Sequence, residues 1–543
     1  MQIDEVENIS GRDTCYKREL LILFALWLVP TLINLNKAFH IDDTFHLEAA
    51  KWIAKHPTEP MSAMVNWYDD PEPISHANQP PLYFYLIACW GSIFGFSEIP
   101  LHIMQSLFTF LSIWLFHRIA SVFSREHAIA LTAILAMNAA FVVNQNLMTD
   151  VPLLSMLLAM VYMLVRTDEI SDARRYGWAA GALSVGLLIK YSLLPMLPVL
   201  AFIMIYDRKY RQLLFLLLPV AALGLWSVWN YIEFGSSHLL NRNAGVPLTQ
   251  IADRANSMLL ATGAVSFFAV LAIQWPGVRN RRLVAWLTGS GVVMFAGLLL
   301  LVYSGKVVQK DATNLLRNLF GVKAALILLS AVVSGVYTAT ATHVDAARRR
   351  QYAIVVVWLA AVFVFIVRFA PFIATRHVLL ILPAIILLLS PFWERAATFT
   401  RAAVLGGTVL MGVVLGLSDR AFADFYRTAA ADYGKFTDTK RVWSVGHWGW
   451  QWYCNGNGVP TLGVHTSEVK DGDEIIAPHH VAKQDVRGFD LTKVRSYYYP
   501  TGILSFFSVS EFAGFYSTTA NEIPWVLSKI AVDSVEVFTV NKK

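Results

Sequence analysis

Charged residues and cysteines are scarce in this sequence. Of its 543 residues, 15% are charged and 56% are hydrophobic, whereas soluble domains average about 25% charged residues. The three cysteines, Cys15, Cys89 and Cys454, lie far apart and form no CxxC pair, which argues against a disulfide framework and a zinc site. The formal charge of +6 comes from Lys and Arg in short loops, so we expect no nucleic-acid partner. The composition is instead typical of a membrane protein.

Hydrophobic runs of membrane length fill most of the chain before residue 418. A helix needs roughly 20 apolar residues to cross the hydrocarbon core, and by that measure we expect about thirteen crossings. They lie at approximately 20–36, 99–119, 127–145, 151–165, 177–190, 192–206, 212–230, 256–275, 283–303, 319–338, 352–368, 377–392 and 402–418. The sequence therefore predicts a polytopic α-helical, multi-pass protein of the plasma or inner membrane.

Loop charges predict the orientation, because cytoplasmic loops are enriched in Lys and Arg. The basic loops all fall on the side of the N-terminus in this count of crossings; they are 166–175, 207–212, 279–282 and 346–350. We therefore place the N-terminus in the cytoplasm. An odd number of crossings puts the C-terminal part outside, on the same side as the long loop 37–98.

The composition changes after residue 418, where no run of membrane length follows. Three segments read as short strands, and a fourth reads as a helix that ends in Gly-rich turns; they are 441–446, 474–481, 535–540 and, for the helix, 449–458. We predict a transmembrane domain at 1–418 and a small extracytoplasmic α/β domain at 419–543.

The first outer loop, residues 37–98, is long for a connection between crossings, and long loops are often functional. After Asp42 its residues follow a helical period, with Glu48 on a polar face and an apolar stripe on the other; the stripe is Phe45, Ala49, Trp52, Ile53 and His56. This pattern predicts an amphipathic helix along the membrane surface. Glu48, His76 and Gln79 are candidate contacts to an acceptor substrate or within the loop.

Two adjacent carboxylates, Asp42 and Asp43, stand at the start of that helix. One of them can cap the helix and complement its dipole. Adjacent side chains point in different directions, so capping explains only one of the two. Ionisable groups at membrane depth usually mark a functional site. The residues alone leave helix capping and a functional site as alternatives.

Four more ionisable residues stand at the outer ends of predicted crossings. Asp150 begins one crossing, where helix capping is the alternative to a functional role. Lys190 ends another, where its long side chain can instead extend to the interface. Arg376 and His377 begin a third, and a cation there opposes the helix dipole. We therefore expect an anion close to Arg376.

Together these residues predict a site at the outer membrane surface. Carboxylates there can accept a proton from a hydroxyl as a general base. The cations Lys190 and Arg376, with His377, can hold a phosphate whose lipid tail lies in the bilayer. A lipid-linked phosphate is the natural small anion at that depth.

Four motifs occur in a fixed order along the chain. The acidic pair is followed by TFHLEAAKWI, and a Pro-Pro-Leu segment is present as NQPPLYFYL at 78–86. The third motif is Thr149, Asp150, Pro152 and Leu153, and the fourth is Arg376, His377, Leu379, Leu380 and Pro383. In these motifs the chain resembles the C-type (GT-C) membrane glycosyltransferases, above all the dolichyl-phosphate-mannose protein mannosyltransferases and the bacterial lipid A aminoarabinose transferases. The resemblance covers residues 20–418.

That resemblance implies an inverting transferase that moves a hexosyl or pentosyl group from a polyprenyl-phosphate donor. The acceptor would be a hydroxyl of a lipid, glycan or protein, met among the membrane lipids. Asp42 would be the general base, and Asp43 and Asp150 would orient the acceptor or shape the site. Lys190 and Arg376 would stabilise the leaving lipid phosphate. The scheme requires no cofactor, and it leaves room for a divalent cation between the donor phosphate and Asp43.

Three positions depart from the family pattern. Asp43 is one methylene shorter than the usual Glu. Gln79 stands where the lipid A enzymes have a Lys, and Phe45 stands where they have a basic residue. Both of these changes remove positive charge near the phosphate, which argues against an aminoarabinose donor. The part after residue 418 also lacks the β-trefoil repeats of the eukaryotic protein mannosyltransferases.

The alternative class is a transporter or flippase of lipid-linked or anionic solutes, which would also place charges at membrane depth. Transporter folds usually contain broken helices in matched halves. One polar interruption is evident in the sequence, at 190–192, and it has no counterpart in a second half. The sequence therefore favours the transferase.

Overall fold

The computed structural model describes most of the chain. The described residues are 2–67, 71–76, 79–166, 170–242, 245–274, 293, 296–297, 300–301, 304, 309–434, 441–463, 468–479, 481–498, 505–507, 514–516, 522–527 and 533–541, with side chains described from residue 17 onward. The crossing predicted at 283–303 lies outside the described residues, apart from a few isolated positions.

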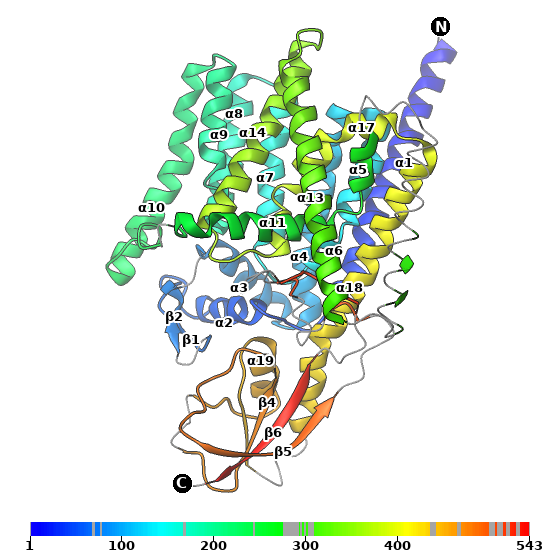
Figure 1. Ribbon diagram of the computed structural model, residues 1–543. Coiled ribbons are helices and arrows are strands. Elements are labelled where there is room, and N and C mark those ends of the chain that lie inside the picture. The colour runs from blue at the N-terminus through cyan, green and yellow to red at the C-terminus, as the bar shows by residue number, and fades with distance from the viewer. Residues whose placement is uncertain are drawn as a thin grey trace.

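Long helices stand side by side and form the upper body of the molecule (Figure 1). They are α1 (Gln2–Asn34), α4 (Glu98–Phe123), α7 (Asp150–Val165), α8 (Asp172–Ile189), α9 (Met196–Tyr206), α10 (Leu217–Phe234), α13 (Gln309–Thr340), α14 (Ala346–Phe369) and α18 (Thr398–Gly434). α7 is buried along nearly its whole length, while α10 is mostly exposed at the edge of the group. Each of these helices coincides with a predicted hydrophobic run.

Five helices in the described residues are long and apolar enough to cross a membrane. They are Glu98–Phe123, Tyr210–Phe234, Thr313–Thr340, Ala346–Phe369 and Thr398–Gly434. Three shorter apolar helices accompany them, at Leu82–Phe94, Asp150–Val165 and Tyr191–Tyr206. The chain is thus a helical membrane-type protein, and the count of about thirteen crossings stays a prediction.

Two predicted crossings are broken into short helices. The run at 127–145 forms α5 (Ala128–Ala136) and α6 (Ala139–Val143). Between them Asn138 accepts the Ala140 N–H at 2.9 Å and donates to the Val265 carbonyl, also at 2.9 Å. These bonds provide partners for backbone groups that the break would otherwise leave buried without a hydrogen bond.

The run at 377–392 breaks at its prolines. It forms α15 (Thr375–Val378), α16 (Leu382–Leu388) and α17 (Ser390–Arg395), and the last two helices each carry a proline in the first turn. Proline has no N–H to continue a helix but fits the first turn of a new one. The break matters for the site, because it leaves Arg376 in the short helix α15.

The run at 256–275 is not an upright helix, contrary to its prediction as a crossing. It forms α11 (Ile251–Val265) and the 3-10 turn η6 (Ala269–Gln274), and α11 lies across the upright helices in Figure 1. Its second half is buried against neighbouring helices. An apolar run gives the same sequence signal whether the helix crosses the layer or lies within it.

The loop 37–98, predicted to lie outside, forms a second layer beneath the upright helices (Figure 1). It contains α2 (Asp43–Ile53), the hairpin of β1 (Met64–Val65) and β2 (Glu72–Pro73), the turn η1 (Ile74–His76) and α3 (Leu82–Phe94). Helix α2 forms where the amphipathic helix was predicted. Its buried face includes His46, Leu47 and Ala50, whereas Phe45 and Trp52 of the predicted apolar stripe are only half-buried.

The C-terminal residues form a mixed four-stranded sheet in the order β3-β4-β6-β5. β3 (Val442–Ser444) runs parallel to β4 (Glu474–Pro478), while β6 (Ser534–Asn541) is antiparallel to both β4 and β5 (Asp490–Tyr498). β3, β4, β6 and helix α19 (Trp448–Gly456) coincide with predicted elements. β5 was not predicted, because it is mostly exposed and shows no alternation of burial.

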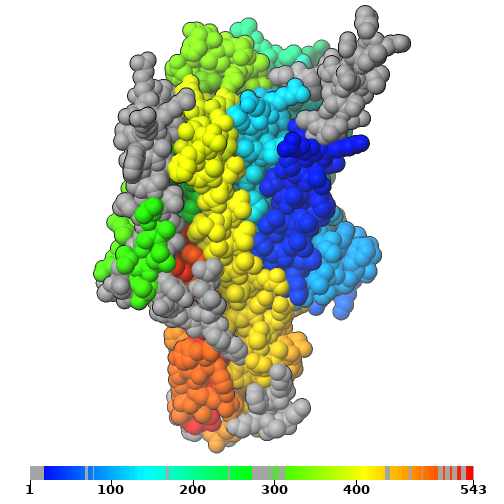
Figure 2. Space-filling view, turned by 90° about the vertical axis from the view of Figure 1, so that its right-hand side faces the viewer, coloured from blue at the N-terminus to red at the C-terminus, as the bar shows by residue number. Residues whose placement is uncertain are grey.

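Helix α18 connects the two ends of the molecule. It continues past residue 418, where the domain boundary is predicted, and ends at Gly434 beside the sheet (Figures 1 and 2). Its lower half carries buried polar residues, including Asp419. The boundary between two domains stays a prediction, since one helix passes through it.

Candidate active site

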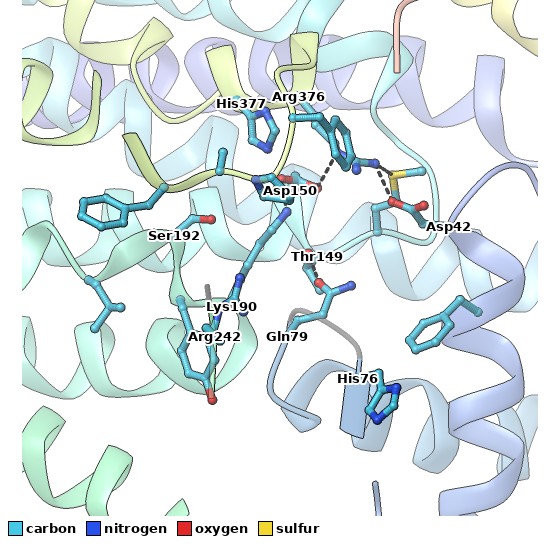
Figure 3. A pocket seen from close by; sticks show the side chains of 18 of the residues that line it. Asp42, His76, Gln79, Thr149, Asp150, Lys190, Ser192, Arg242, Arg376 and His377 are labelled. Atoms are coloured by element: carbon cyan, nitrogen blue, oxygen red, sulfur yellow. Dashed lines mark hydrogen bonds and ion pairs between the residues drawn. The ribbon is translucent and has the colours of Figure 1, made fainter. Parts of the chain in front are cut away.

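A cavity of about 870 Å³ opens where the upright helices meet the outer-loop layer. Its wall includes seven of the nine predicted site residues: Asp42, His76, Gln79, Asp150, Lys190, Arg376 and His377. Figure 3 shows these side chains arranged around the cavity, from segments far apart in the sequence. The other two, Asp43 and Glu48, are not among the described residues that line it.

Two carboxylates and two cations form a chain of ion pairs on the cavity wall (Figure 3). Arg376 Nη1 lies 2.7 Å from Asp42 Oδ2, and Arg376 Nε lies 3.9 Å from Asp150 Oδ2. Lys190 Nζ lies 2.8 Å from Asp150 Oδ1. The side chains of Asp150 and Arg376 are 3% and 7% exposed. Buried charges need such partners, so each group here holds its neighbour in place.

Arg376 has an unused hydrogen-bond donor. Its Nε is buried and has no acceptor within hydrogen-bond distance among the described residues. Its Nη1 points to Asp42 and to Met148 Sδ, 3.1 Å away. A guanidinium binds a phosphate best through two parallel N–H groups. The Arg376 side chain can therefore accept a further anion in the cavity.

A tight turn at residues 40–43 directs the two adjacent carboxylates to different surroundings. Ile41 has φ of 51°, a left-handed conformation that is rare for a β-branched residue. The turn is closed in both directions, because His40 N–H donates to Asp43 Oδ2 at 2.9 Å and Asp43 N–H donates to the His40 carbonyl at 3.2 Å. Asp43 is fully buried, whereas the Asp42 side chain is 25% exposed on the cavity wall.

Helix capping does not account for Asp42. It is the N-cap residue of α2, yet its side chain makes no capping hydrogen bond in this described helix. Its carboxylate instead contacts Arg376. Thr149, the N-cap of α7, likewise makes no side-chain cap bond there, and Asp150 is paired with Lys190. Both aspartates therefore serve the cavity rather than their helices.

Asp43 and Glu48 lie in α2 away from the cavity. Burial raises the pKa of Asp43 to about 7, and its Oδ1 has no hydrogen-bond partner in the described part of the chain. Burial also raises the pKa of Glu48 to about 7. Near neutral pH both carboxyl groups are therefore partly protonated, which suits structural positions better than direct contact with a charged substrate.

A hydrogen-bonded row orients the amide of Gln79. His46 Nδ1–H donates to the Leu147 carbonyl at 2.6 Å, which leaves Nε2 as an acceptor. Gln79 Nε2 donates to that Nε2 at 2.8 Å, and Thr149 Oγ1 donates to Gln79 Oε1 at 2.9 Å. Burial lowers the pKa of His46 to about 4, so the ring is neutral. Gln79 keeps one amide N–H for a ligand.

His46, which lines the cavity, was not predicted as a site residue, although its spacing from Asp42 is a signal. It follows Asp42 by four residues, and residues four apart share one face of a helix. Arg242 of the outer loop 231–255 was also missed. It lines the cavity and stacks over the Tyr191 ring, with 5.1 Å from its guanidinium carbon to the ring centre. It adds a third cationic side chain to the cavity wall, in addition to Lys190 and Arg376.

The two predicted histidines differ in their surroundings. His76 is exposed and lies 3.3 Å from Glu72 at the mouth of the cavity. His377 is buried, and its Nδ1 accepts the Ala374 N–H at 3.1 Å. That bond fixes the start of α15, and hence the place of Arg376.

One side of the cavity is apolar. Side chains from the end of α14 and the following turn, together with a residue of the loop 231–255, form this wall: Phe365, Phe369, Phe372 and Leu239. Such a wall suits a hydrocarbon chain beside the cationic groups. No group of three or more His, Cys, Asp or Glu side chains that could hold a metal ion is found within the described ranges.

Comparison with known proteins yields a family match. Residues 78–231 match the sequence model of the family described as dolichyl-phosphate-mannose-protein mannosyltransferase. The matched part contains Gln79, Asp150 and Lys190 of the cavity wall. A search of curated proteins found no match. The match covers the second and third of the four motifs and confirms the resemblance of this part of the chain to the dolichyl-phosphate-mannose protein mannosyltransferases.

Several solved structures are similar to the chain at low identity, each with a TM-score below 0.5. ArnT from Cupriavidus metallidurans in the apo state is 14% identical, with a TM-score of 0.38 over 86% of this chain and 93% of that chain. The Pmt1-Pmt2 protein O-mannosyltransferase complex of S. cerevisiae, bound to the sugar donor, is 16% identical, with a TM-score of 0.31 over 40% and 34%. The oligosaccharyltransferase AglB from Archaeoglobus fulgidus is 12% identical, with a TM-score of 0.45 over 77% and 58%.

Proposed function

We propose that this chain transfers a sugar from a polyprenyl-phosphate donor to an acceptor hydroxyl at the outer face of the membrane, with inversion at the anomeric carbon. The observation that supports this most is the contact of Asp42 with Arg376 on the cavity wall. It brings a carboxylate that can accept a proton next to a guanidinium that can hold a phosphate.

The donor phosphate binds between Arg376 and Lys190. The guanidinium of Arg376 and the ammonium of Lys190 belong to residues on the wall of the same cavity, and Arg376 Nε donates no hydrogen bond to a described residue. The phosphate competes with Asp42 and Asp150 for these cations, so the two carboxylates hold the cations ready for it. The lipid chain leaves along the apolar wall that includes Phe369.

Asp42 acts as the general base. It accepts the proton of the acceptor hydroxyl as that oxygen forms a bond to the anomeric carbon. The bond from this carbon to the phosphate oxygen breaks, and the lipid phosphate leaves with both electrons. Because attack comes opposite the leaving group in one displacement, the configuration inverts. Arg376 and Lys190 stabilise the phosphate charge, so the scheme requires no metal ion.

The test is an assay of the purified protein with a panel of radiolabelled hexosyl and pentosyl polyprenyl phosphates, and with lipid, glycan and protein acceptors. Release of lipid phosphate distinguishes transfer from flipping, because flipping leaves the sugar–phosphate bond intact. Asp42→Asn should lower turnover by about 10²–10⁴-fold, since the amide cannot accept the proton.

Glu72→Gln is the matched control, because Glu72 is a third carboxylate on the cavity wall, beside Asp42 and Asp150, but is paired with the exposed His76 and not with Arg376 or Lys190. It should leave turnover within a few fold of wild type. Near-normal turnover of Asp42→Asn protein would exclude Asp42 as the base. Movement of an intact lipid-linked sugar across the bilayer, without released phosphate, would support a flippase instead.

A further inference from the structure

A short stretch near the C-terminus, residues 514–516, lies against the upright helices, although the strands of the sheet, β5 and β6, flank it in sequence (Figure 1). Phe515 is 1% and Tyr516 8% exposed. The notable feature is what these two residues bind. Their partners lie in the three segments that carry Arg376, Asp150 and Asp42, and in helix α18.

The first partner is the turn that carries Arg376. The Phe515 carbonyl accepts the Thr375 hydroxyl at 2.7 Å and the Thr375 N–H at 3.3 Å. Thr375 is fully buried and directly precedes Arg376 at the start of α15. This backbone carbonyl therefore fixes the turn from which the guanidinium reaches into the cavity.

The other partners meet at the Tyr516 hydroxyl, which is buried and fully used. It donates to Asp419 Oδ1 at 2.8 Å and accepts from Asn146 Nδ2 at 2.8 Å and from Lys37 Nζ at 3.3 Å. Lys37 also donates to Asn146 and Asp419. Lys37, Asn146 and Asp419 have no exposed surface.

This buried network continues into the segments of the two cavity-wall carboxylates, Asp42 and Asp150. Lys37 opens the loop that leads to Asp42, and the Tyr516 ring packs edge-on against His40, with ring centres 5.3 Å apart. Asn146 opens the turn that leads to Asp150. The three segments thus meet one short stretch of chain that is more than a hundred residues away from each of them in sequence.

We propose that Phe515 and Tyr516 are positioning residues, which hold the segment of the base and the segment of the phosphate-binding arginine in register across the cavity. This rests on the proposed function, which makes Asp42 and Arg376 the two groups that must be aligned. A displacement of about 1 Å by a change far from the chemistry can lower turnover by about 100-fold. The C-terminal part of the chain is then a component of the active site.

Phe515 and Tyr516 hold different segments of the site. Removing the contacts of one or the other should therefore affect turnover and donor binding to different extents. Tyr516→Phe keeps the ring but removes all three hydroxyl bonds, so the loops of Asp42 and Asp150 loosen while the Phe515 carbonyl still holds Thr375. Turnover should fall at least about tenfold, and by a larger factor than the affinity for a lipid phosphate, because the turn of Arg376 stays held.

Thr375→Val has the opposite signature. It removes the hydroxyl bond to the Phe515 carbonyl and leaves only the longer bond from the Thr375 N–H, at 3.3 Å. The turn of Arg376 is then held less firmly, so the affinity for undecaprenyl phosphate without a sugar should fall at least about tenfold. Thr375→Ser keeps the hydroxyl and should restore that affinity. A purely structural role of Thr375 would affect expression and melting temperature of both variants without this split.

Tyr426→Phe is the matched control for Tyr516→Phe. Tyr426 is a buried tyrosine of α18, and its hydroxyl donates to the carboxylate of Asp533 at 3.1 Å. That bond joins α18 to the residue before β6 and involves none of the three site segments. The Tyr426 ring does stack on His40, with ring centres 5.9 Å apart, and the phenylalanine keeps that ring. We expect turnover and lipid-phosphate affinity of Tyr426→Phe within about twofold of wild type.

Hydrogen exchange gives a readout that does not depend on activity. In the full-length protein, amides of 37–43 and 144–149 should exchange faster in Tyr516→Phe than in wild type or Tyr426→Phe. Unchanged exchange in both segments, together with unchanged turnover, would overturn the proposal, as would equal effects of Tyr426→Phe. If exchange changes as expected but wild-type protein releases no lipid phosphate from any donor, the proposed function fails while the positioning role stands.

Discussion

The buried carboxyl of Asp43 should make the stability of the protein depend on pH in a specific direction. Its folded pKa is raised to about 7 by burial, against about 3.9 in an unfolded chain. A raised pKa means that the folded state favours the protonated form. The stabilisation is therefore complete below about pH 4 and is lost as the pH rises through about 7.

The perturbation is Asp43→Asn, which cannot ionise. The difference of roughly 3 pKa units, at about 1.36 kcal/mol each, corresponds to about 4 kcal/mol. The asparagine side chain can still accept the His40 N–H through its amide oxygen. Its amide nitrogen, however, places two N–H donors where protonated Asp43 has one O–H, at an oxygen that has no partner among the described residues, so the variant adds one unsatisfied donor. A buried unsatisfied donor costs about 1–3 kcal/mol. The variant should therefore be less stable than wild type near pH 4.5 and more stable near pH 8.

The assay is thermal unfolding of both proteins in detergent at several pH values from 4.5 to 8, followed by the fluorescence of the 17 tryptophans. The difference in melting temperature between variant and wild type removes the contribution of all other groups. It should change sign within this range. A constant difference across the range would show that Asp43 does not hold its proton through burial, and would refute the reasoning.

Two further predictions concern the cations and the topology. Arg376→Ala should weaken the binding of undecaprenyl phosphate by about 30-fold or more, since truncating one side of a buried charged contact costs about 2–5 kcal/mol; Arg376→Lys should recover part of it, and unchanged affinity would place the phosphate elsewhere. In protein lacking Cys15, Cys89 and Cys454, cysteines at the exposed positions Thr58 and Leu240 should react with an impermeant thiol reagent in intact cells. Cysteines at Ser171 and Ala346 should react only after permeabilisation, and the reverse pattern would put Asp42 in the cytoplasm.

Much of the helical layer could be predicted, because a hydrophobic run of membrane length has few alternatives to a helix. The direction of such a helix relative to the membrane could not be predicted from the sequence. The run that contains α11 was therefore predicted as a crossing, although α11 lies perpendicular to the upright helices. The breaks near Pro383 and Pro391 have a signal in the sequence, because proline has no N–H to continue a helix. The exposed strand β5 has no such signal in its sequence, since neither of its faces is consistently buried.

The candidate site was predicted through its charges, and its details depended on contacts that no local pattern encodes. A misplaced cation at a helix start required an anion, and the structure places Asp42 and Asp150 beside Arg376. Which of two adjacent aspartates faces the cavity depends on the left-handed conformation of Ile41, for which an isoleucine gives no sequence signal. Tyr516 approaches from more than a hundred residues away, so periodicity and spacing could not associate it with the site.

The paired charges on the cavity wall link the two halves of the proposed reaction. Two carboxylates face two cations, so these four groups balance one another before any substrate binds. When Asp42 takes the acceptor's proton it loses its charge, and its hold on Arg376 weakens at that moment. The guanidinium, 2.7 Å away, is then released toward the phosphate oxygen on which negative charge is growing. Removal of the proton and capture of the leaving group are thereby one concerted exchange of partners at a single arginine.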